Sequence, residues 1–396
     1  MAAFAQQDMS YYTSDYMRTE GTFVQRLSIL ESVRDLNRTG IGEFYHEALK
    51  YLLLRSVDIG NNRDEQEAAE RSVVILSQGL GAEKYTAAAG DLWQAVVFTD
   101  IVKRTTNDAN AVQAALIALG QVDGRDFIDN IIDRLNIYNI QNLNNAETRR
   151  RYQTAVIGCI NALETLKDTR GYRPVFFASV GRYDQAVRAI ASNALPNIAD
   201  DPGDIISAII QDPSSNPTVK LEAWNQMLRT RAPNASKARV AATALATGWN
   251  FSTTNRDFLV KLGEMRKSAI DAIRQFGVAD SSVYADLERS YSRNFTARAP
   301  DSDEIMFTLN TLAAVKSEEA VDLLYKFLYE IHTERRMRGR WGENERQIYQ
   351  WLVACLGITG TRSPEVRLLL TTINRTDRYT PFEQGLARNA LTALGY

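Results

Sequence analysis

The stretch Ala111-Val-Gln-Ala-Ala-Leu-Ile-Ala-Leu-Gly-Gln-Val-Asp-Gly-Arg-Asp-Phe-Ile-Asp-Asn-Ile-Ile-Asp-Arg-Leu135 contains two apolar helical patterns separated by a turn. In its first half, apolar residues recur at the spacing of one helix face, namely Val112, Ala115, Leu116 and Leu119. In its second half, Phe127, Ile131 and Leu135 repeat every four residues. One such pair cannot cover both of its apolar faces, so we expect stacked copies.

The residues between these two patterns specify the turn. Gly120 follows the first pattern and is expected to end that helix in the left-handed conformation. Asp123-Gly124 is a turn signal, and Asp126 is expected to cap the second helix. The stretch therefore predicts a helix, a tight turn and a second helix.

The same two-helix pattern returns along the chain. Residues 390–395, Ala-Leu-Thr-Ala-Leu-Gly, echo residues 115–120, Ala-Leu-Ile-Ala-Leu-Gly. A late apolar anchor can be marked in each repeat: Leu119, Leu163, Ile198, Leu228, Phe276, Leu312, Leu356 and Leu394. Their spacings run from roughly 30 to 48 residues, the size of a two-helix repeat. We therefore predict an all-α chain folded as an α-solenoid (α-α superhelix) of divergent helix pairs.

Residues 23–396 resemble the HEAT and armadillo class of α-solenoids in repeat size and in their small-residue helix faces. The resemblance is architectural, because the Pro, Asp and Arg positions of those families do not recur regularly. Tetratricopeptide repeats are the nearest competitor, but their Trp-Leu-Gly…Tyr pattern is missing. The resemblance implies a non-enzymatic scaffold for protein–protein interaction, or a structural component of an assembly, with a protein partner that the sequence does not identify.

Residues 1–22 are predicted to be a polar lead-in to the solenoid. Ala3-Phe4-Ala5, followed by two glutamines, has the small-x-small form of a signal-cleavage site, so we interpret the lead-in as the remnant of an export signal. A helical chain with two cysteines then favours a bacterial periplasm, with the cytoplasm as the alternative. Residues 293–300 are irregular and are predicted to be a hinge.

Composition and charge narrow the possible partners. The chain of 396 residues carries 46 basic and 48 acidic side chains, a net charge of −2, which argues against a nucleic-acid partner. No apolar run is long enough to span a bilayer, so we predict no transmembrane segment.

The sequence offers no catalytic or metal-binding set. Its two histidines, His46 and His332, and its two cysteines, Cys159 and Cys355, do not stand at the spacing of metal ligands. Gly79-Leu80-Gly81 is expected to be a plain loop that ends a helix, because it lacks the rest of a phosphate-binding fingerprint. Residues 200–204, Asp-Asp-Pro-Gly-Asp, are expected to break one helix and begin the next. We therefore predict no enzyme activity, metal or cofactor.

Two basic runs are the remaining candidates for a binding surface. The denser run suggests partner-contact residues Arg335, Arg336, Arg338, Arg340 and Trp341, because arginine and tryptophan are enriched at binding hot spots. The alternative for this run is a solvated loop with local ion pairs to nearby glutamates. A smaller run, residues 149–151, is expected on the outer face of its helix.

Two alternatives to the scaffold follow from the fold class. A HEAT-like solenoid could bind nucleic acid or act in DNA repair, and both basic runs would then have to line one groove. A chaperone-like or lyase-like solenoid that presents a small molecule is the third hypothesis, suggested by the tyrosine- and tryptophan-rich helices.

Overall fold

The computed structural model describes residues 2–18, 20–60, 62–102, 109–141, 145–297, 300–338 and 342–396. These residues form twenty α-helices and four short 3₁₀ helices, and this part of the chain contains no strand. Along the chain it divides into two compact units, Met1–Asp200 and Asp201–Tyr396. The all-α solenoid predicted from the sequence is therefore confirmed.

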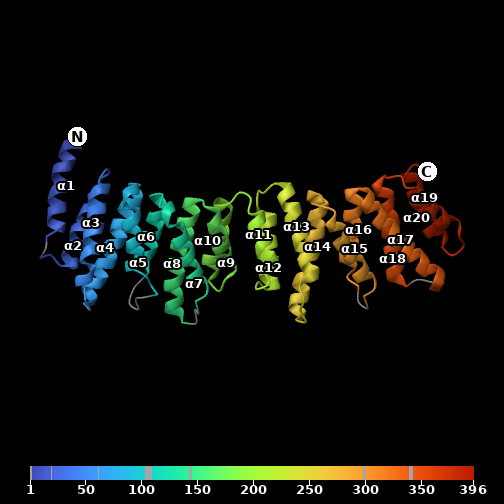
Figure 1. Ribbon diagram of the computed structural model, residues 1–396, viewed down its shortest axis with the longest axis horizontal. Helices are drawn as coiled ribbons and strands as arrows, with labels where there is room; N and C mark the ends of the chain where they lie inside the picture. The colour runs from blue at the N-terminus through green and yellow to red at the C-terminus, as the bar shows by residue number, and fades with distance from the viewer. Residues whose placement is uncertain are drawn as a thin grey trace. The chain divides into compact units, whose positions relative to one another are not determined.

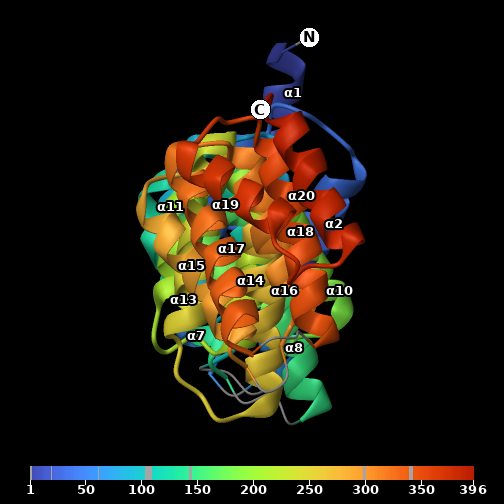
Figure 2. The same cartoon turned by 90° about the vertical axis from the view of Figure 1, so that its right-hand side faces the viewer.

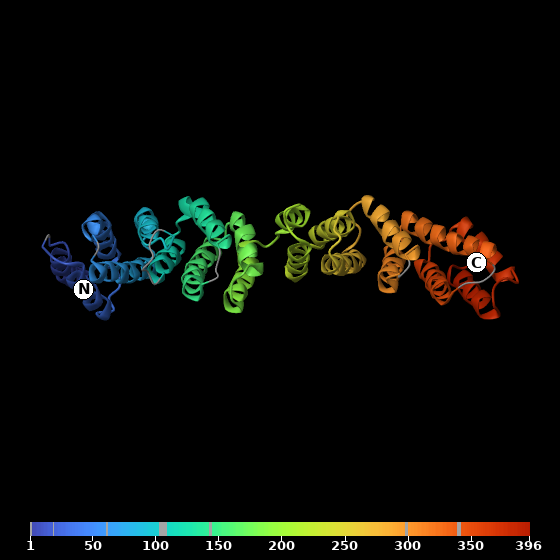
Figure 3. The same cartoon turned by 90° about the horizontal axis from the view of Figure 1, so that it is seen from below.

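The first unit stacks five helix pairs. Its helices are α1 (Ala2–Tyr16), α2 (Phe23–Asp35), α3 (Gly42–Arg55), α4 (Arg63–Ala82), α5 (Ala89–Phe98), α6 (Asn110–Gln121), α7 (Ile128–Asn139), α8 (Ala146–Leu166), α9 (Tyr172–Val180) and α10 (Gln185–Ile198). The even-numbered helices contact one another in order and form one layer (Figure 1). The odd-numbered helices contact their pair partners and form the other layer; Figure 3 shows this unit from below in blue to green.

The second unit repeats this two-layer arrangement. Its helices are α11 (Gly203–Gln211), α12 (Pro217–Arg229), α13 (Asn234–Asn250), α14 (Arg256–Phe276), α15 (Ser282–Phe295), α16 (Ser302–Val315), α17 (Glu318–Arg338), α18 (Glu343–Thr359), α19 (Pro364–Arg375) and α20 (Pro381–Ala393). Odd-numbered helices contact along one layer and even-numbered helices along the other, as α17 and α19 against α18 and α20 show in Figure 2.

The stretch that predicted the helix pair forms α6 and α7, but its turn differs from the prediction. Gly120 lies inside α6, and a Cβ atom built on it would come within 3.0 Å of the Ala162 Cα atom in α8. Its role is therefore close packing of α6 on α8. Asp123 takes the left-handed conformation instead, with a φ of 60°. Asp126 caps neither the 3₁₀ turn at Arg125–Phe127 nor α7.

A second correction concerns Gly79-Leu80-Gly81, which we predicted to be a loop. Helix α4 continues to Ala82 and includes both glycines. A Cβ atom on Gly79 would lie 2.5 Å from the Tyr45 ring of α3, so glycine is needed for the two helices to pack. Because this contact joins residues 34 positions apart, the local sequence pattern did not indicate it.

The structure adds a helix where we predicted none. Helix α1 covers most of residues 1–22, and its Tyr16 is fully buried against Phe44 and Tyr51 of α3. The predicted break at residues 200–204 lies where the two units meet in sequence. The segment 293–300 lies within the second unit, between α15 and α16, with residues 298 and 299 outside the described residues. Its role as a hinge stays a prediction.

Candidate functional site

A groove of about 820 Å³ lies on the even-helix layer of the first unit. We call it the α4–α6 groove. Helices α4 and α6 provide most of its lining, and α2 and α8 provide one edge each. The described lining residues are Glu31, Arg34, Arg63, Glu67, Glu70, Arg71, Val74, Ile75, Gln78, Ala82, Ala109, Asn110, Ala111, Gln113, Ala114, Ile117, Gln121, Glu147, Arg150 and Arg151. Its size is within the range of ordinary ligand pockets.

Small and apolar side chains form the floor of the α4–α6 groove. Ala111 and Ala114 on α6 are buried, and Val74 on α4 and Ile117 on α6 are half-buried. Helix α6 begins after Ala109, which has a φ of 62° and makes no side-chain capping bond. The floor therefore offers an apolar surface next to the amino-terminal end of α6.

Charged side chains of both signs surround this floor. On one side, Arg71 of α4 donates to the Glu31 carboxylate of α2 at 2.8 Å, and Arg63 pairs with Glu67 along α4 at the same distance. These side chains are mostly exposed, so water and salt screen the pairs. On the other side, α8 contributes Arg150. Five arginines and four glutamates are among the described lining residues, so the groove has a mixed charge.

The sequence singled out a different region, the end of α17 in the second unit. There Arg335 donates from Nε and Nη2 to the Arg378 carbonyl oxygen, at 3.1 and 2.8 Å. Arg378 in turn donates from Nη1 to the Arg336 carbonyl oxygen at 3.0 Å, and Arg338 pairs with Glu334 at 3.1 Å. Arg340 and Trp341 lie outside the described residues. The structure thus brings Arg335 and Arg336 together with the loop between α19 and α20, and their contact with a partner stays a prediction.

A buried histidine lies beside these arginines. The His332 Nδ1 atom is 2.9 Å from the Tyr379 hydroxyl, and the two rings are stacked with centroids 5.9 Å apart. Burial lowers the pKa of His332 below its ordinary value, and the Arg336 and Arg378 guanidinium groups lower it further. Burial also raises the pKa of the Tyr379 hydroxyl, which therefore stays protonated at neutral pH.

Two other buried polar side chains, His46 and Lys220, have partners within the fold. His46 of α3 lies 2.7 Å from an Asp91 carboxylate oxygen on α5. Lys220 donates to the carbonyl oxygens of Ile210 and Asp212 and so completes the end of α11. Burial raises the pKa of the Cys159 thiol to about 12 and that of Cys355 to about 11, which keeps both protonated and unreactive at neutral pH.

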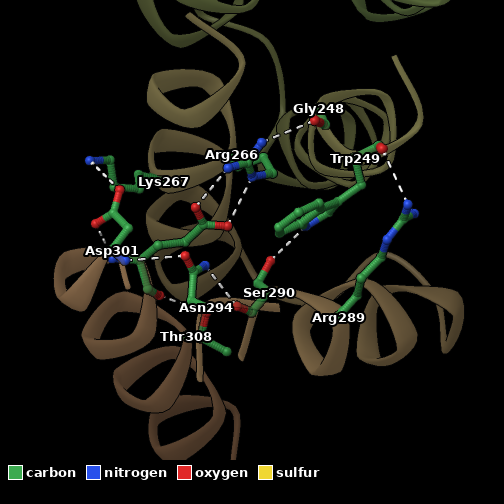
Figure 4. A network of polar contacts seen from close by, with 10 residues as sticks. Gly248, Trp249, Arg266, Lys267, Arg289, Ser290, Asn294, Asp301 and Thr308 are labelled. Carbon is green, nitrogen blue, oxygen red and sulfur yellow. Dashed lines mark hydrogen bonds and ion pairs between the residues drawn. The ribbon is translucent and has the colours of Figure 1, made fainter. Parts of the chain in front are cut away.

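An extended polar network joins α13 to α16 in the second unit (Figure 4). Arg266 donates to the Gly248 carbonyl oxygen and lies over the Trp249 ring, 4.0 Å from its centroid. The Trp249 indole donates to the Ser290 hydroxyl at 2.8 Å, and Lys267 pairs with Asp301 at 3.1 Å. Because these groups bind one another, we interpret the network as a structural contact that holds the helices together.

Sequence reasoning missed the α4–α6 groove. Of its lining, Arg150 and Arg151 belong to the basic run that we expected on the outer face of its helix, and Ala111, Ala114 and Ile117 lie in the stretch that predicted the helix pair. None of these residues carries a local signal for a groove, because the groove exists only when helices some 40 residues apart in sequence pack side by side. A search for exposed positions along each even-numbered helix could have found it.

Two findings concern metal binding and the membrane. Across the described ranges, no group of three His, Cys, Asp or Glu side chains is arranged to hold a metal ion. In the same ranges, no helix combines the length and the apolar character needed to cross a bilayer.

Together, the paired helices, two layers and groove define the chain as an all-α helical-repeat solenoid. No family model matches the chain, and no curated protein matches it in sequence. Among solved structures, it is similar to the crystal structure of SYS-1, with a TM-score of 0.34 and 10% identity, covering 96% of this chain and 72% of that one. It is also similar to a circular tandem repeat protein with a novel repeat topology, with a TM-score of 0.21 and 13% identity over 100% and 85% of the two chains. Because both TM-scores are below 0.5, the fold class follows from this chain's own helices.

Proposed function

We propose that the chain is a HEAT-like, non-enzymatic scaffold that binds a protein partner in the α4–α6 groove. The observation that carries this proposal is the groove itself, which combines an apolar floor with a rim of both charges. Protein interfaces commonly have this composition, with an apolar centre and a polar rim. We propose the bacterial periplasm or another exported location as its compartment, with the cytoplasm as the alternative.

The charge of the groove favours a protein over a nucleic acid. A nucleic-acid groove neutralises several phosphates and needs an excess of cations. Here the arginines of the rim alternate with glutamates, and Arg71 is already paired with Glu31.

Site-specific photocrosslinking in the source cells tests the proposal. A photoreactive residue at Gln78 or Ile117 would report on the groove, and one at the exposed Leu54 of α3 would report on the opposite layer. We expect one dominant protein adduct from both groove positions and none of it from Leu54. The adduct should be recovered from the periplasmic fraction if the export prediction is right.

Three results would count against the scaffold. Equal labelling from Leu54 would remove the groove as the docking surface. A nucleic-acid adduct, or a small-molecule adduct without protein, would favour one of the two alternative functions. Catalytic turnover that a single polar substitution abolishes would contradict a non-enzymatic role.

A further inference from the structure

We propose that His332 is an acid-sensitive latch: when its imidazole gains a proton, the loop at residues 376–380 detaches from the end of α17 and exposes Tyr379 with the guanidinium groups of Arg335 and Arg378. The inference goes beyond the scaffold function and does not depend on it. It starts from the geometry of the loop between α19 and α20, which lies against the end of α17.

Hydrogen bonds join this loop to the end of α17, the Arg335 guanidinium lies over the Tyr379 ring, and Tyr349 of α18 packs on that ring with centroids 5.5 Å apart. The Tyr379 hydroxyl and the His332 imidazole form one hydrogen bond, at 2.9 Å. The Arg335 guanidinium binds the Arg378 carbonyl oxygen, and the Arg378 guanidinium binds the Arg336 carbonyl oxygen, so the two segments are joined reciprocally. His332 is 5% exposed and Tyr379 is 3% exposed, so water has little access to either side chain while the loop is closed.

The charges around His332 determine how it responds to acid. On its own helix, Arg335 and Arg336 are cationic, and the loop contributes the cation of Arg378 and the exposed carboxylate of Asp377. Protonated His332 would be a further cation with little access to water, and burying such a charge without an anionic partner is costly. Opening the loop would hydrate the imidazolium and separate it from Arg378.

Among the described residues, the acidic groups on the other elements packed here already have partners of their own. On α18, the Tyr349 hydroxyl donates to the Glu383 carbonyl oxygen at 2.8 Å, and burial raises its pKa so that it stays neutral. On α20, the Glu383 carboxylate already accepts from the Thr380 backbone N–H at 2.8 Å and lies 3.6 Å from the Arg346 Nε atom. Two acidic side chains of α17 near His332 in sequence interact with other groups. Glu334 pairs with Arg338, and Glu330 interacts with Lys326 and Glu288.

Hydrogen exchange of the full chain at pH 7.0 and pH 5.5, corrected for the intrinsic effect of pH on exchange, tests the latch. If the open-state imidazole has its ordinary pKa of 6.5 and the closed state is not protonated, the open population of residues 376–380 should rise about eightfold. The variant His332→Gln keeps a hydrogen-bonding side chain but cannot gain the proton, so its loop should not respond.

His46 provides a matched control, because it is the other histidine of the chain and lies in the first unit. The variant His46→Gln should keep the full response of residues 376–380. A response that persists in His332→Gln would assign it to another group, such as Glu330, and would overturn the proposal. A wild-type loop that does not respond to the change in pH would also overturn the proposal.

A direct titration covers the case in which His332→Gln does not fold. In the wild-type chain, the imidazole proton resonances of His332 should titrate below pH 6.5, with His46→Gln assigning the two histidines. A midpoint at or above 6.5 would mean that the closed loop does not disfavour the proton, and the latch would be rejected.

Discussion

Arg266 donates two hydrogen bonds of 2.9 Å, from Nε and Nη2, to the two carboxylate oxygens of Glu304. Glu304 is fully buried, so this pair is a bidentate ion pair inside the second unit. It joins α14 to α16, while the Trp249 ring packs on the guanidinium from α13. The pair and the ring therefore join three helices of the second unit, α13, α14 and α16.

Breaking this pair should destabilise the second unit strongly. In Arg266→Met, the carboxylate of Glu304 would stay buried without its partner, and we expect a loss of about 3–5 kcal/mol in the free energy of unfolding. Urea denaturation measures the loss, and hydrogen exchange should locate it in α13 to α16.

The double variant Arg266→Met/Glu304→Leu distinguishes the buried charge from lost packing. Because it removes both charges, it should recover much of the stability lost in the single variant. A double variant as unstable as Arg266→Met would contradict this explanation. The exposed pair Lys261–Glu264 of the same helix is the control, and Lys261→Met should change stability by less than about 1 kcal/mol.

Replacing glycine with alanine should have opposite effects on stability at two positions of the first unit. In Gly120→Ala, the new methyl group would meet the backbone of Ala162, and we expect α6 and α8 to separate at a cost of about 1–3 kcal/mol. In Gly90→Ala, no atom lies within 4 Å of the new methyl group, and the higher helix propensity of alanine should stabilise α5 by up to about 1 kcal/mol. Thermal unfolding of the two variants checks the signs, and equal shifts would contradict the close packing of Gly120.

Local interactions made part of this fold predictable from sequence. The Thr380 side chain accepts from the Glu383 backbone N–H, and the Glu383 side chain accepts from the Thr380 N–H, which together form a capping box at the start of α20. At the start of α19, the Ser363 side chain accepts from the Val366 backbone N–H and Pro364 occupies the first helical position. These groups lie within three residues of one another, so the sequence alone contains the interaction.

Contacts between distant residues explain what the sequence did not indicate. Gly79 and Gly120 looked like helix ends because glycine is common there, but the rings and backbones they contact come from neighbouring helices. The α4–α6 groove also depends on contacts between residues that are distant in sequence. Its edges, such as Glu31 on α2 and Arg150 on α8, become one site only through stacking.

The Asp168 carboxylate should make the first unit sensitive to strong acid. Its hydrogen bonds with the Arg170 side chain lower its pKa below the ordinary value of 3.8. A carboxylate with a lowered native pKa stabilises the fold above 3.8, and this contribution disappears as the pH falls through the native pKa. Asp168→Asn should therefore melt at a lower temperature than wild type at pH 6, and the difference should vanish toward pH 2. A difference that stays constant over this range would show that the charge is not responsible.

Reversing one charge of the groove should weaken partner binding without changing the stability of the fold. Arg150 is exposed on α8 and lines the α4–α6 groove, and no ion pair involves it within the part of the chain that the structure describes. Arg150→Glu should therefore change the free energy of unfolding by less than about 0.5 kcal/mol. Partner recovery through the groove crosslinkers should fall at least tenfold, which corresponds to about 1.4 kcal/mol of binding free energy.

The matched control is Arg182→Glu, which changes an exposed arginine of the same unit outside the groove and should keep full recovery. Equal losses in both variants would point to net charge as the cause, and no loss in Arg150→Glu would exclude the α8 edge from the docking surface.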